Sequence, residues 1–446
     1  MDIIRGLLGI FVIIGIAFLS SNNKKKINWK LVGVGLLLQI IFAVLILFSE
    51  SFTGIFFPLA IPKIIIEGIG KGIVNLLNYT TEGAKFVFGK LAINNGSESI
   101  GFFFAFQVLP TIIFVSSLTS ILYYLGVLQK VVQGMAFVMT KLMGTSGAES
   151  LSNTANIFVG QTEAPLLIRP YISTMTQSEL YTIMVGGMAT IAGGVMAAYI
   201  QMLGQSFADA NNQSIDVAQI KFAVQLLAAS VMAAPAGLAI SKIIYPETEE
   251  PKTKGNVKIK VEKNASNIVE AAASGASDGL QLALNVGGML LAFIALITML
   301  NAILIWSGDV FHINEYFKTT FGKPLSMELL FGLIFQFVAF AIGVPLNDAL
   351  NFGSLIGTKI VLNEFVAYWD LSHLIQTGKI GEKTTMMATY ALCGFANFSS
   401  IAIQIGGISP MAPERKKDIA QLGMKAVLGG TLTTLLTATI GGIFYN

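Results

Sequence analysis

Charged residues are scarce in this chain: Asp, Glu, Lys and Arg together make up 12% of its 446 residues. A soluble domain carries about twice that fraction, so a soluble globular fold is excluded. In their place the chain has apolar residues, which make up 54% of the sequence and give a mean hydropathy of +0.71. This composition predicts a polytopic membrane protein.

Cysteine and histidine are almost missing as well. Cys393 is the single cysteine, which excludes a disulfide framework within the chain. The two histidines, His312 and His373, are far apart and have no Cys or His neighbours, which argues against a zinc site. The sequence also lacks a GxxxxGK[ST] motif, so it has no P-loop for ATP. An enzyme is therefore not expected, and any active transport would need an ion gradient or another chain's ATPase.

Eight segments are long and apolar enough to cross a membrane, which takes roughly 20 residues. These segments are 3–19, 31–48, 102–128, 181–202, 220–244, 280–306, 384–408 and 424–444. The stretches 55–91, 131–142 and 329–350 are also apolar, but they are shorter, amphipathic or broken by Pro and Gly. We expect them to be interfacial helices or arms of re-entrant hairpins. The predicted fold is an all-α membrane protein with about eight transmembrane helices.

Lysine and arginine are concentrated in three connections between these spans. They are Lys24–Lys26 after the first span, the linker 246–263 after the fifth, and the segment 415–417 before the eighth. With eight spans all three fall on one face, which the positive-inside rule makes cytoplasmic. We therefore expect an integral protein of the cytoplasmic (inner) membrane with both termini outside.

Two short polar stretches interrupt the apolar sequence, one in each half of the chain. The stretch 156–166 contains Glu163, and the stretch 359–368 contains Glu364. A carboxylate inside a membrane is costly, so it indicates a functional site. Two of them at matching positions predict an inverted repeat of two re-entrant helical hairpins, with the site between the repeats.

The first stretch has the residues of a hairpin tip. Pro165 suits the first turn of a helix, and Gly160 allows the backbone to turn and approach a ligand. Gln161, Thr162 and Glu163 would then lie where a helix N-terminus presents free N–H groups. Because Glu and Gln together accept and donate hydrogen bonds, the tip suits a polar, uncharged heterocycle.

Three segments, 156–166, 363–368 and 394–401, resemble the signature motifs of concentrative nucleoside transporters of the bacterial, eight-helix type. The resemblance extends from about residue 100 to the C-terminus. It implies a cation-coupled nucleoside importer, a homotrimer, that works by elevator-like alternating access. The implied parts are scaffold helices 1–3 with interfacial helices (1–128), a first transport repeat (129–245), a cytoplasmic linker (246–265), an interfacial helix with the sixth, scaffold span (266–307), and a second transport repeat (308–446).

The resemblance also implies which residues bind the substrate and the ion. The implied substrate contacts are Gly160, Gln161, Thr162 and Glu163 for the nucleobase, Val195 and Phe395 packed against it, and Glu364, Asn397 and Ser400 for the ribose hydroxyls. The implied sodium ligands are Asn156, Val159, Thr190 and Ile191. No covalent cofactor and no nucleic acid partner are expected, beyond the nucleoside, the ion and membrane lipid.

Three alternatives stay open at the level of sequence. The coupling ion could be a proton, since proton-coupled relatives tend to lose the sodium oxygens. The hairpins could instead serve another small polar solute such as a dicarboxylate, although Arg169 is the one cation near the first tip and the expected site is net acidic. Finally, Glu163 and Glu364 could be structural, paired with Arg169 or Lys359.

Overall fold

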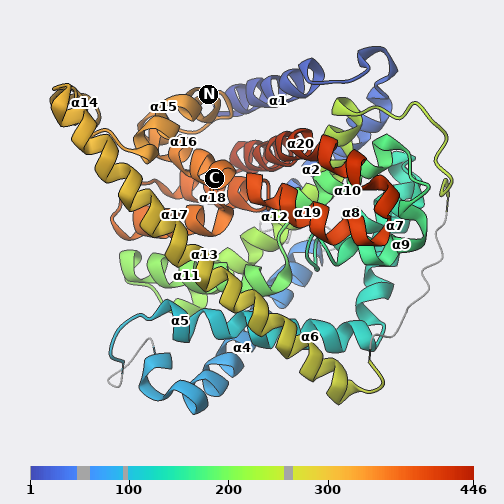
Figure 1. Ribbon diagram of the computed structural model, residues 1–446, viewed down its shortest axis with the longest axis horizontal. Helices are drawn as coiled ribbons and strands as arrows, with labels where there is room; N and C mark the ends of the chain where they lie inside the picture. Colours follow the sequence, from blue (N-terminus) through green and yellow to red (C-terminus); the bar gives the residue numbers. More distant parts are fainter. Residues whose placement is uncertain (1, 48–60, 94–98, 256–264, 446) are drawn as a thin grey trace.

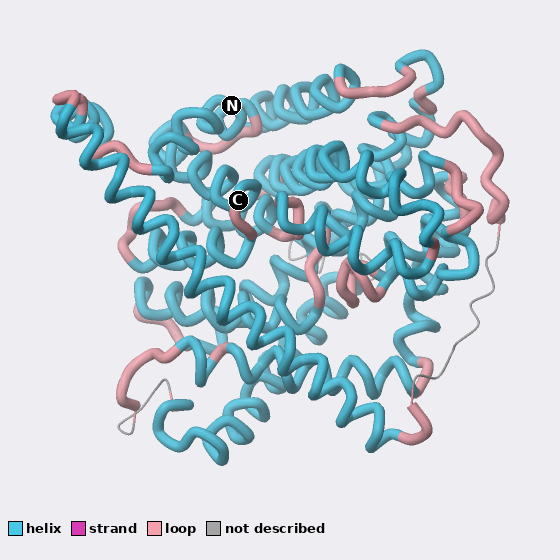
Figure 2. Tube along the Cα trace, in the orientation of Figure 1, coloured by secondary structure: helices cyan, strands magenta, loops and turns pink. Residues whose placement is uncertain are grey.

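The computed structural model describes residues 2–47, 61–93, 99–255 and 265–445, and the regular elements in these ranges are all helices (Figures 1 and 2). The expected all-α fold is confirmed. Parts of three expected segments lie outside the described residues: residue 48 of the second span, residues 55–60 of the apolar stretch after it, and residues 256–263 of the linker.

Six helical segments of the described ranges are long and apolar enough to cross a membrane. Three of them are single helices: Trp29–Leu47 (α2), Ile215–Ile244 (α12) and Ile268–Val310 (α13). Two are pairs of helices: Phe104–Tyr124 consists of α5 (Phe104–Gln107) and α6 (Leu109–Tyr124), and Gln177–Asn211 consists of α10 (Gln177–Ala189) and α11 (Gly193–Asn211). The sixth, Pro413–Ile443, ends in α20 (Lys416–Ile443). The two other expected spans coincide with the shorter α1 (Asp2–Leu19) and with the pair α18 (Glu382–Leu392) and α19 (Phe398–Ile408). The number of membrane crossings stays a prediction.

The stretches expected to be interfacial or hairpin arms are helical too. They correspond to α4 (Ile61–Phe88), α7 (Val127–Met143), and α15 (Met327–Ala341) with the start of α16 (Leu346–Val361). In place of a separate interfacial helix and span in 266–307, the chain forms one 43-residue helix, α13. It crosses the molecule diagonally in Figure 1 and passes close to α6, since a Cβ at Gly279 would lie 2.8 Å from Ile113 Cα. The short helix α14 (Asn314–Phe321) follows it.

Two sets of elements follow the same order in the two halves. In the first half, a hairpin made of α8 (Gly147–Ala155), a 3₁₀ turn (Ala164–Ile168) and α9 (Arg169–Ile172) is followed by the broken span α10–α11 and the closing helix α12. In the second half, the hairpin α16–α17 (α17, Glu364–Gln376) is followed by the broken span α18–α19 and the closing helix α20. This order matches the predicted repeat.

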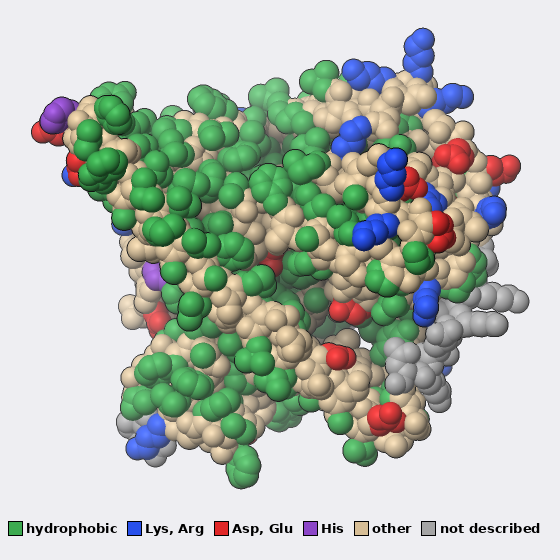
Figure 3. All heavy atoms as spheres, in the orientation of Figure 1, with side chains coloured by type: hydrophobic (Ala, Val, Ile, Leu, Met, Phe, Trp, Pro, Cys, Tyr) green, Lys and Arg blue, Asp and Glu red, His purple; other side chains and the backbone are tan. Residues whose placement is uncertain are grey.

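The base of the first hairpin lies on the lysine-rich face. The linker is attached there, because Gly147 N donates to Thr253 O at 2.8 Å. Arg415 Nη1 donates to Met175 O at 2.5 Å, just beyond the other arm. Asn22 N, next to the lysines of the first connection, donates to Ile244 O at 2.9 Å. The three basic connections therefore share one side of the molecule, and Figure 3 shows many Lys and Arg side chains gathered there.

The second hairpin has its base on the opposite side. Asp348 Oδ2, near the start of α16, accepts from Gly381 N at 3.1 Å and from Thr384 Oγ1 at 2.6 Å. Asn351 Nδ2 donates to Lys379 O at 3.0 Å. Asp348 and Asn351 therefore hold α16 to the start of α18 and to the loop before it. The two hairpins thus enter from opposite faces, as an inverted repeat requires.

A buried ionic cluster holds the base of the first hairpin together. Lys242 Nζ of α12 lies 2.7 Å from Glu149 Oε2 and 3.4 Å from Glu247 Oε2. Glu149 closes a capping box at the start of α8, and Glu179 closes another at the start of α10. Ser146 Oγ joins the two boxes by donating to Glu179 Oε1 at 2.5 Å. The start of each helix is therefore fixed to α12 and to the linker.

The first and last helices pack together. A Cβ at Gly9 of α1 would lie 3.0 Å from Thr439 Cγ2 of α20, and one at Gly6 would meet Ile443. Small residues allow such a close approach of helices in a membrane. Helices α1 and α20 therefore lie side by side.

Candidate functional site

The two broken spans meet at their breaks in the centre of the molecule. A Cβ at Gly394, in the break between α18 and α19, would lie 2.6 Å from Met188 O, just before the break between α10 and α11. The tip of the first hairpin packs on the same place, because Gly193 N donates to Phe158 O at 3.2 Å. Irregular backbone at membrane depth is tolerated where protein buries it or where it lines a cavity. The irregular backbone at these breaks is both buried in protein and next to a cavity.

Two asparagines begin the half-helices of the second repeat. Asn363 Oδ1 accepts from Val366 N at 2.9 Å and caps α17, whose first residue is Glu364. Asn397 Oδ1 accepts from Ser400 N at 2.8 Å and caps α19. Both caps occupy the preferred N-cap geometry. The positive ends of two helix dipoles are thereby placed beside the same polar site.

Side chains of both repeats form hydrogen bonds at this site. Glu364 Oε1 accepts from the hydroxyl of Tyr199 at 3.1 Å, and its Oε2 accepts from Asn397 Nδ2 at 3.0 Å. Gln161 Nε2, from the first hairpin tip, donates to Ser400 Oγ at 3.2 Å. Gln161 Oε1 is buried and has no partner among the described residues, so it is free to accept from a ligand.

A cavity of about 170 Å³ lies between the two hairpin tips. It is lined by all nine residues predicted to contact the substrate: Gly160, Gln161, Thr162, Glu163, Val195, Glu364, Phe395, Asn397 and Ser400. Its other wall is an apolar strip of α13 that includes Leu282, Val286 and Met289. The cavity thus combines convergent polar groups with an apolar wall, which is typical of sites for small molecules.

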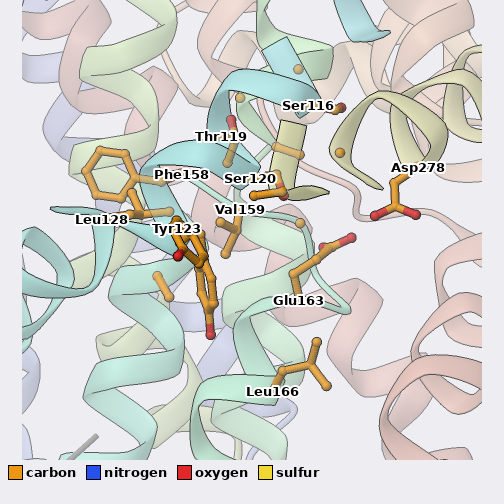
Figure 4. Close-up of a pocket in the computed structure, with 18 of the residues that line it drawn as sticks. Ser116, Thr119, Ser120, Tyr123, Leu128, Phe158, Val159, Glu163, Leu166 and Asp278 are labelled. Carbon is orange, nitrogen blue, oxygen red and sulfur yellow. The ribbon is translucent and has the colours of Figure 1, made fainter. Parts of the chain in front are cut away.

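A larger cavity of about 340 Å³ adjoins the first and shares Gly160 and Glu163 with it. Hydroxyl residues of α6 and Asp278 of α13 line it, and in Figure 4 Glu163 and Asp278 extend into the same space. It reaches Ala265, at the end of the linker on the lysine-rich side. On the other side the aromatic rings of Phe104, Phe365 and Tyr199 pack together, with centroids 4.9–5.6 Å apart. The cavities therefore extend toward the lysine-rich face, and aromatic side chains pack on the opposite side of the site.

The carboxylate of Glu163 forms no hydrogen bond or ion pair with any residue that the structure describes, and it is exposed to the cavities. Its carboxylate lies against Gly160: a Cβ there would be 2.1 Å from Glu163 Oε2. Lys359 does not pair with Glu364, because its ammonium donates to Ala391 O and Thr434 Oγ1 instead. The contacts therefore do not favour the structural ion pairs considered from the sequence.

The four residues predicted to bind sodium come from the first hairpin tip and the break that it contacts. Asn156 is buried, and its Nδ2 donates to Ser152 O at 3.0 Å while its Oδ1 has no partner in the described part of the chain. Thr190 ends α10 in an extended conformation with its hydroxyl buried, and Ile191 follows it in the break, as Val159 does in the tip. An unpaired buried oxygen costs about 1–3 kcal/mol. A cation beside Asn156 Oδ1 would offset this, so these residues fit the ion.

Tyr199 was missed by the sequence reasoning, although it donates directly to Glu364. Its ring is fully buried and packs on Tyr368 with centroids 4.2 Å apart. A buried tyrosine usually needs a hydrogen-bond partner for its hydroxyl. A tyrosine inside the apolar span that follows the first hairpin was therefore a usable signal.

Comparison with known proteins gives consistent matches along the chain. Residues 8–91 match the family model described as "Na+ dependent nucleoside transporter N-terminus", residues 105–206 "Nucleoside recognition", and residues 225–442 "Na+ dependent nucleoside transporter C-terminus". The chain is 44% identical to the transporter YutK of Bacillus subtilis, with all of both chains covered. It is 39% identical to human sodium/nucleoside cotransporter 1, covering 98% of this chain and 63% of the human protein.

Solved structures agree with the sequence matches. The chain is similar to CNTnw in an inward-facing substrate-bound state, with 40% identity, a TM-score of 0.86, and coverage of 100% of this chain and 98% of that one. It is equally similar to CNTnw carrying two substitutions in an outward-facing state, with a TM-score of 0.86. These matches span the whole chain at well above 30% identity, and the protein belongs to the sodium-dependent nucleoside transporter family.

Proposed function

We propose that this protein imports nucleosides across the cytoplasmic membrane by symport with sodium. The observation that carries the proposal is the cavity between the two hairpin tips, which brings together all nine residues predicted for the substrate. No Lys or Arg is among the described residues that line it. A dicarboxylate would need such a cation, so the lining favours a neutral solute.

The nucleobase is assigned to the first hairpin tip. Gln161 offers an unpaired carbonyl oxygen and Glu163 an unpaired carboxylate, so together they accept from the exocyclic and ring N–H groups of a base. Val195 and Phe395 line the same cavity and pack on the faces of the base. The ribose is assigned to Glu364, since hydrogen bonds from hydroxyls to a carboxylate are about twice as strong as neutral ones.

Sodium is assigned to Asn156, Thr190 and the carbonyls of Val159 and Ile191. Asn156 Oδ1 is a buried oxygen that lacks a partner in the described structure. When bound, the ion would supply positive charge between the first hairpin tip and the break in α10–α11. The tip and the break are joined by the hydrogen bond from Gly193 N to Phe158 O, which lies next to the base-binding residues. Sodium and nucleoside then raise each other's affinity by the same factor.

Alternating access is assigned to an elevator-like movement of the two repeats against the scaffold. The cavity meets α13 along an apolar strip, Leu282 to Leu290, which offers no fixed hydrogen bonds to a passing polar site. With the lysine-rich face in the cytoplasm and both termini outside, the open cavity faces inward. The boundaries at residues 128, 245, 265 and 307 separate the moving parts from the scaffold, and the trimer would assemble through the scaffold.

Uptake of radiolabelled uridine and adenosine into proteoliposomes tests the proposal. Purified protein is exposed either to a sodium gradient or to a proton gradient in sodium-free buffer. Uptake driven by sodium alone supports the symporter and its ion residues. Uptake driven by protons keeps the nucleoside site and contradicts the sodium site. Failure to take up either nucleoside under both gradients would contradict the proposal, and labelled succinate would then be tested.

A further inference from the structure

Lys359 is a fully buried lysine for which the proposed transport cycle has no use. It lies in α16, the first arm of the second hairpin, five residues before Glu364. Its ammonium donates to Ala391 O at 2.8 Å and to Thr434 Oγ1 at 3.1 Å. A charge at this depth is costly and is retained where it has a function. Its two acceptors indicate what that function is.

These contacts join three elements of the second repeat. Ala391 lies in the last turn of α18, directly before the break, and Thr434 lies in the closing helix α20. The ammonium is therefore located where the hairpin arm, the broken span and the closing helix meet. It binds a neutral carbonyl oxygen and a neutral hydroxyl oxygen, the same kinds of group that are proposed to bind sodium.

The corresponding place in the first repeat has oxygens and no ammonium. Asn153 Nδ2, in the arm α8, donates to Ala234 O of the closing helix α12 at 3.1 Å. Its Oδ1 lies against Gly186 of the broken span, where a Cβ would be 2.4 Å away. Thr190 Oγ1 donates to Gly186 O at 3.0 Å in the same region. Arm, broken span and closing helix therefore meet here too.

The two arms differ in their unsatisfied oxygens. The first arm and its C-cap contain four buried side-chain oxygens that have no partner in the described structure: Ser152 Oγ, Asn153 Oδ1, Thr154 Oγ1 and Asn156 Oδ1. Among the described residues of α16 there is none. The first arm thus has buried oxygens without a partner in the described structure, whereas the second arm has a cation whose acceptors are already in place.

We infer that the ammonium of Lys359 is a tethered cation that occupies, in the second repeat, the place that sodium takes in the first. The inference rests on the proposed function. Lys359 is a positioning residue: it holds α16 to the break of α18–α19 and so keeps Glu364 beside Asn397. The ribose half of the site is then assembled without a diffusible ion, and sodium acts on the nucleobase half alone.

The test measures equilibrium binding to the purified full-length protein carrying Lys359→Met. We expect uridine affinity to fall about 10-fold or more, because the ribose groups lose their alignment. Binding of 2′,3′-dideoxyuridine, which lacks the 2′- and 3′-hydroxyls of the ribose, should change less than about 2-fold. Sodium affinity in the absence of nucleoside should also stay within about 2-fold. The exposed Lys379→Met is the matched control and should behave like the wild type.

Two further variants separate charge from packing. Lys359→Gln keeps a donor for Ala391 O but removes the charge, and it should show the same selective loss; full recovery with Gln would overturn the tethered cation. Thr434→Val removes one acceptor and should reduce uridine affinity selectively, by about 2- to 5-fold. If the Lys359 variants do not fold, binding by Thr434→Val tests the inference in their place.

The remaining outcomes are also decisive. Equal losses for uridine and dideoxyuridine, or no loss for either, would overturn the inference, as would a large change in sodium affinity. These results differ from failure of the proposed function, in which the wild-type protein itself binds no uridine or no sodium.

Discussion

The hydroxyl of Tyr199 lies 3.1 Å from Oε1 of Glu364 and joins the broken span of the first repeat to the hairpin of the second. Asn397 Nδ2 donates a hydrogen bond to the other carboxylate oxygen, Oε2, at 3.0 Å. Glu364 is thus oriented by one donor from each repeat. The geometry of the ribose half therefore depends on how the two repeats pack together.

Removing the Tyr199 hydroxyl should weaken nucleoside binding selectively. In Tyr199→Phe the ring stays packed on Tyr368, but Glu364 loses one of two donors, a loss of about 1 kcal/mol or roughly 5-fold in affinity. Uridine affinity should fall by this factor, measured by calorimetry, while 2′,3′-dideoxyuridine is little affected. The exposed Tyr316→Phe is the control. An equal loss for both ligands would point to general damage to the packing.

Glu364→Gln should have a larger effect than Tyr199→Phe. The new amide NH₂ cannot accept a hydrogen bond, so whichever donor it faces, the Tyr199 hydroxyl or Asn397 Nδ2, is left without an acceptor in a buried site. The loss is about 1–3 kcal/mol, equivalent to roughly 5- to 150-fold in the KM for uridine. Uptake kinetics in proteoliposomes give this value, with the exposed Glu315→Gln as control. A KM within 2-fold of the wild type would remove Glu364 from the ribose site.

Asn156→Ala should mainly raise the sodium requirement. It removes the buried Oδ1 that has no protein partner in the described ranges, and it leaves the substrate cavity unchanged. We expect the sodium concentration for half-maximal uptake to rise at least about 10-fold, with uridine KM partly recovered at saturating sodium. An unchanged sodium dependence would show that the ion binds elsewhere.

Gly160→Ala tests the position of the Glu163 carboxylate. The new Cβ would lie 2.1 Å from Oε2, so the carboxylate must move away from the tip. Affinity for nucleosides should fall several-fold, and to the same extent for uridine and its dideoxy analogue, since the base is affected. Gly134→Ala, in α7 with open space around it, is the control. Normal binding by Gly160→Ala would mean that Glu163 does not need its observed position.

Lys242→Met should reduce stability strongly. It leaves Glu149 and Glu247 without their buried cation, and breaking such a pair costs about 3–5 kcal/mol. A lower thermal midpoint in detergent would report the loss. Lys254→Met, at an exposed pair with Glu250, should change the midpoint little. Adding Glu149→Gln to Lys242→Met should restore part of the midpoint, and no recovery would mean that the lysine acts through packing.

The sequence supported the prediction of the two hairpins because their tips carry local signals. Gly160, Pro165 and Asn363 each have a backbone role that depends on near neighbours in the chain. The intramembrane glutamates were equally visible, since a charge in an apolar context stands out in a linear sequence. Eight of the nine cavity residues lie in the three short motifs that carry the family resemblance, and the resemblance also implied Val195, which lies in the span after the first hairpin.

Contacts between distant elements were beyond a single sequence. Tyr199 and Glu364 are 165 residues apart, and nothing near either residue indicates the other. The linker was predicted to be a cytoplasmic connection, and nothing in its sequence indicates that Thr253 is hydrogen-bonded to the start of α8. Lys242 is buried at the end of an apolar helix, and its neighbours in the sequence do not indicate its ion pair with Glu149. Each of these features depends on packing that brings separate segments together.

The packing of α1 on α20 has a consequence for biosynthesis. Helix α1 is translated before its partner α20, which begins about 400 residues later. At roughly 5–20 residues per second, α1 waits roughly 20 to 80 s for that partner. Membrane helices insert individually before they associate. During this interval the lipid bilayer must hold α1 in place, and its glycine-bearing face is buried against α20 only after α20 has been synthesised.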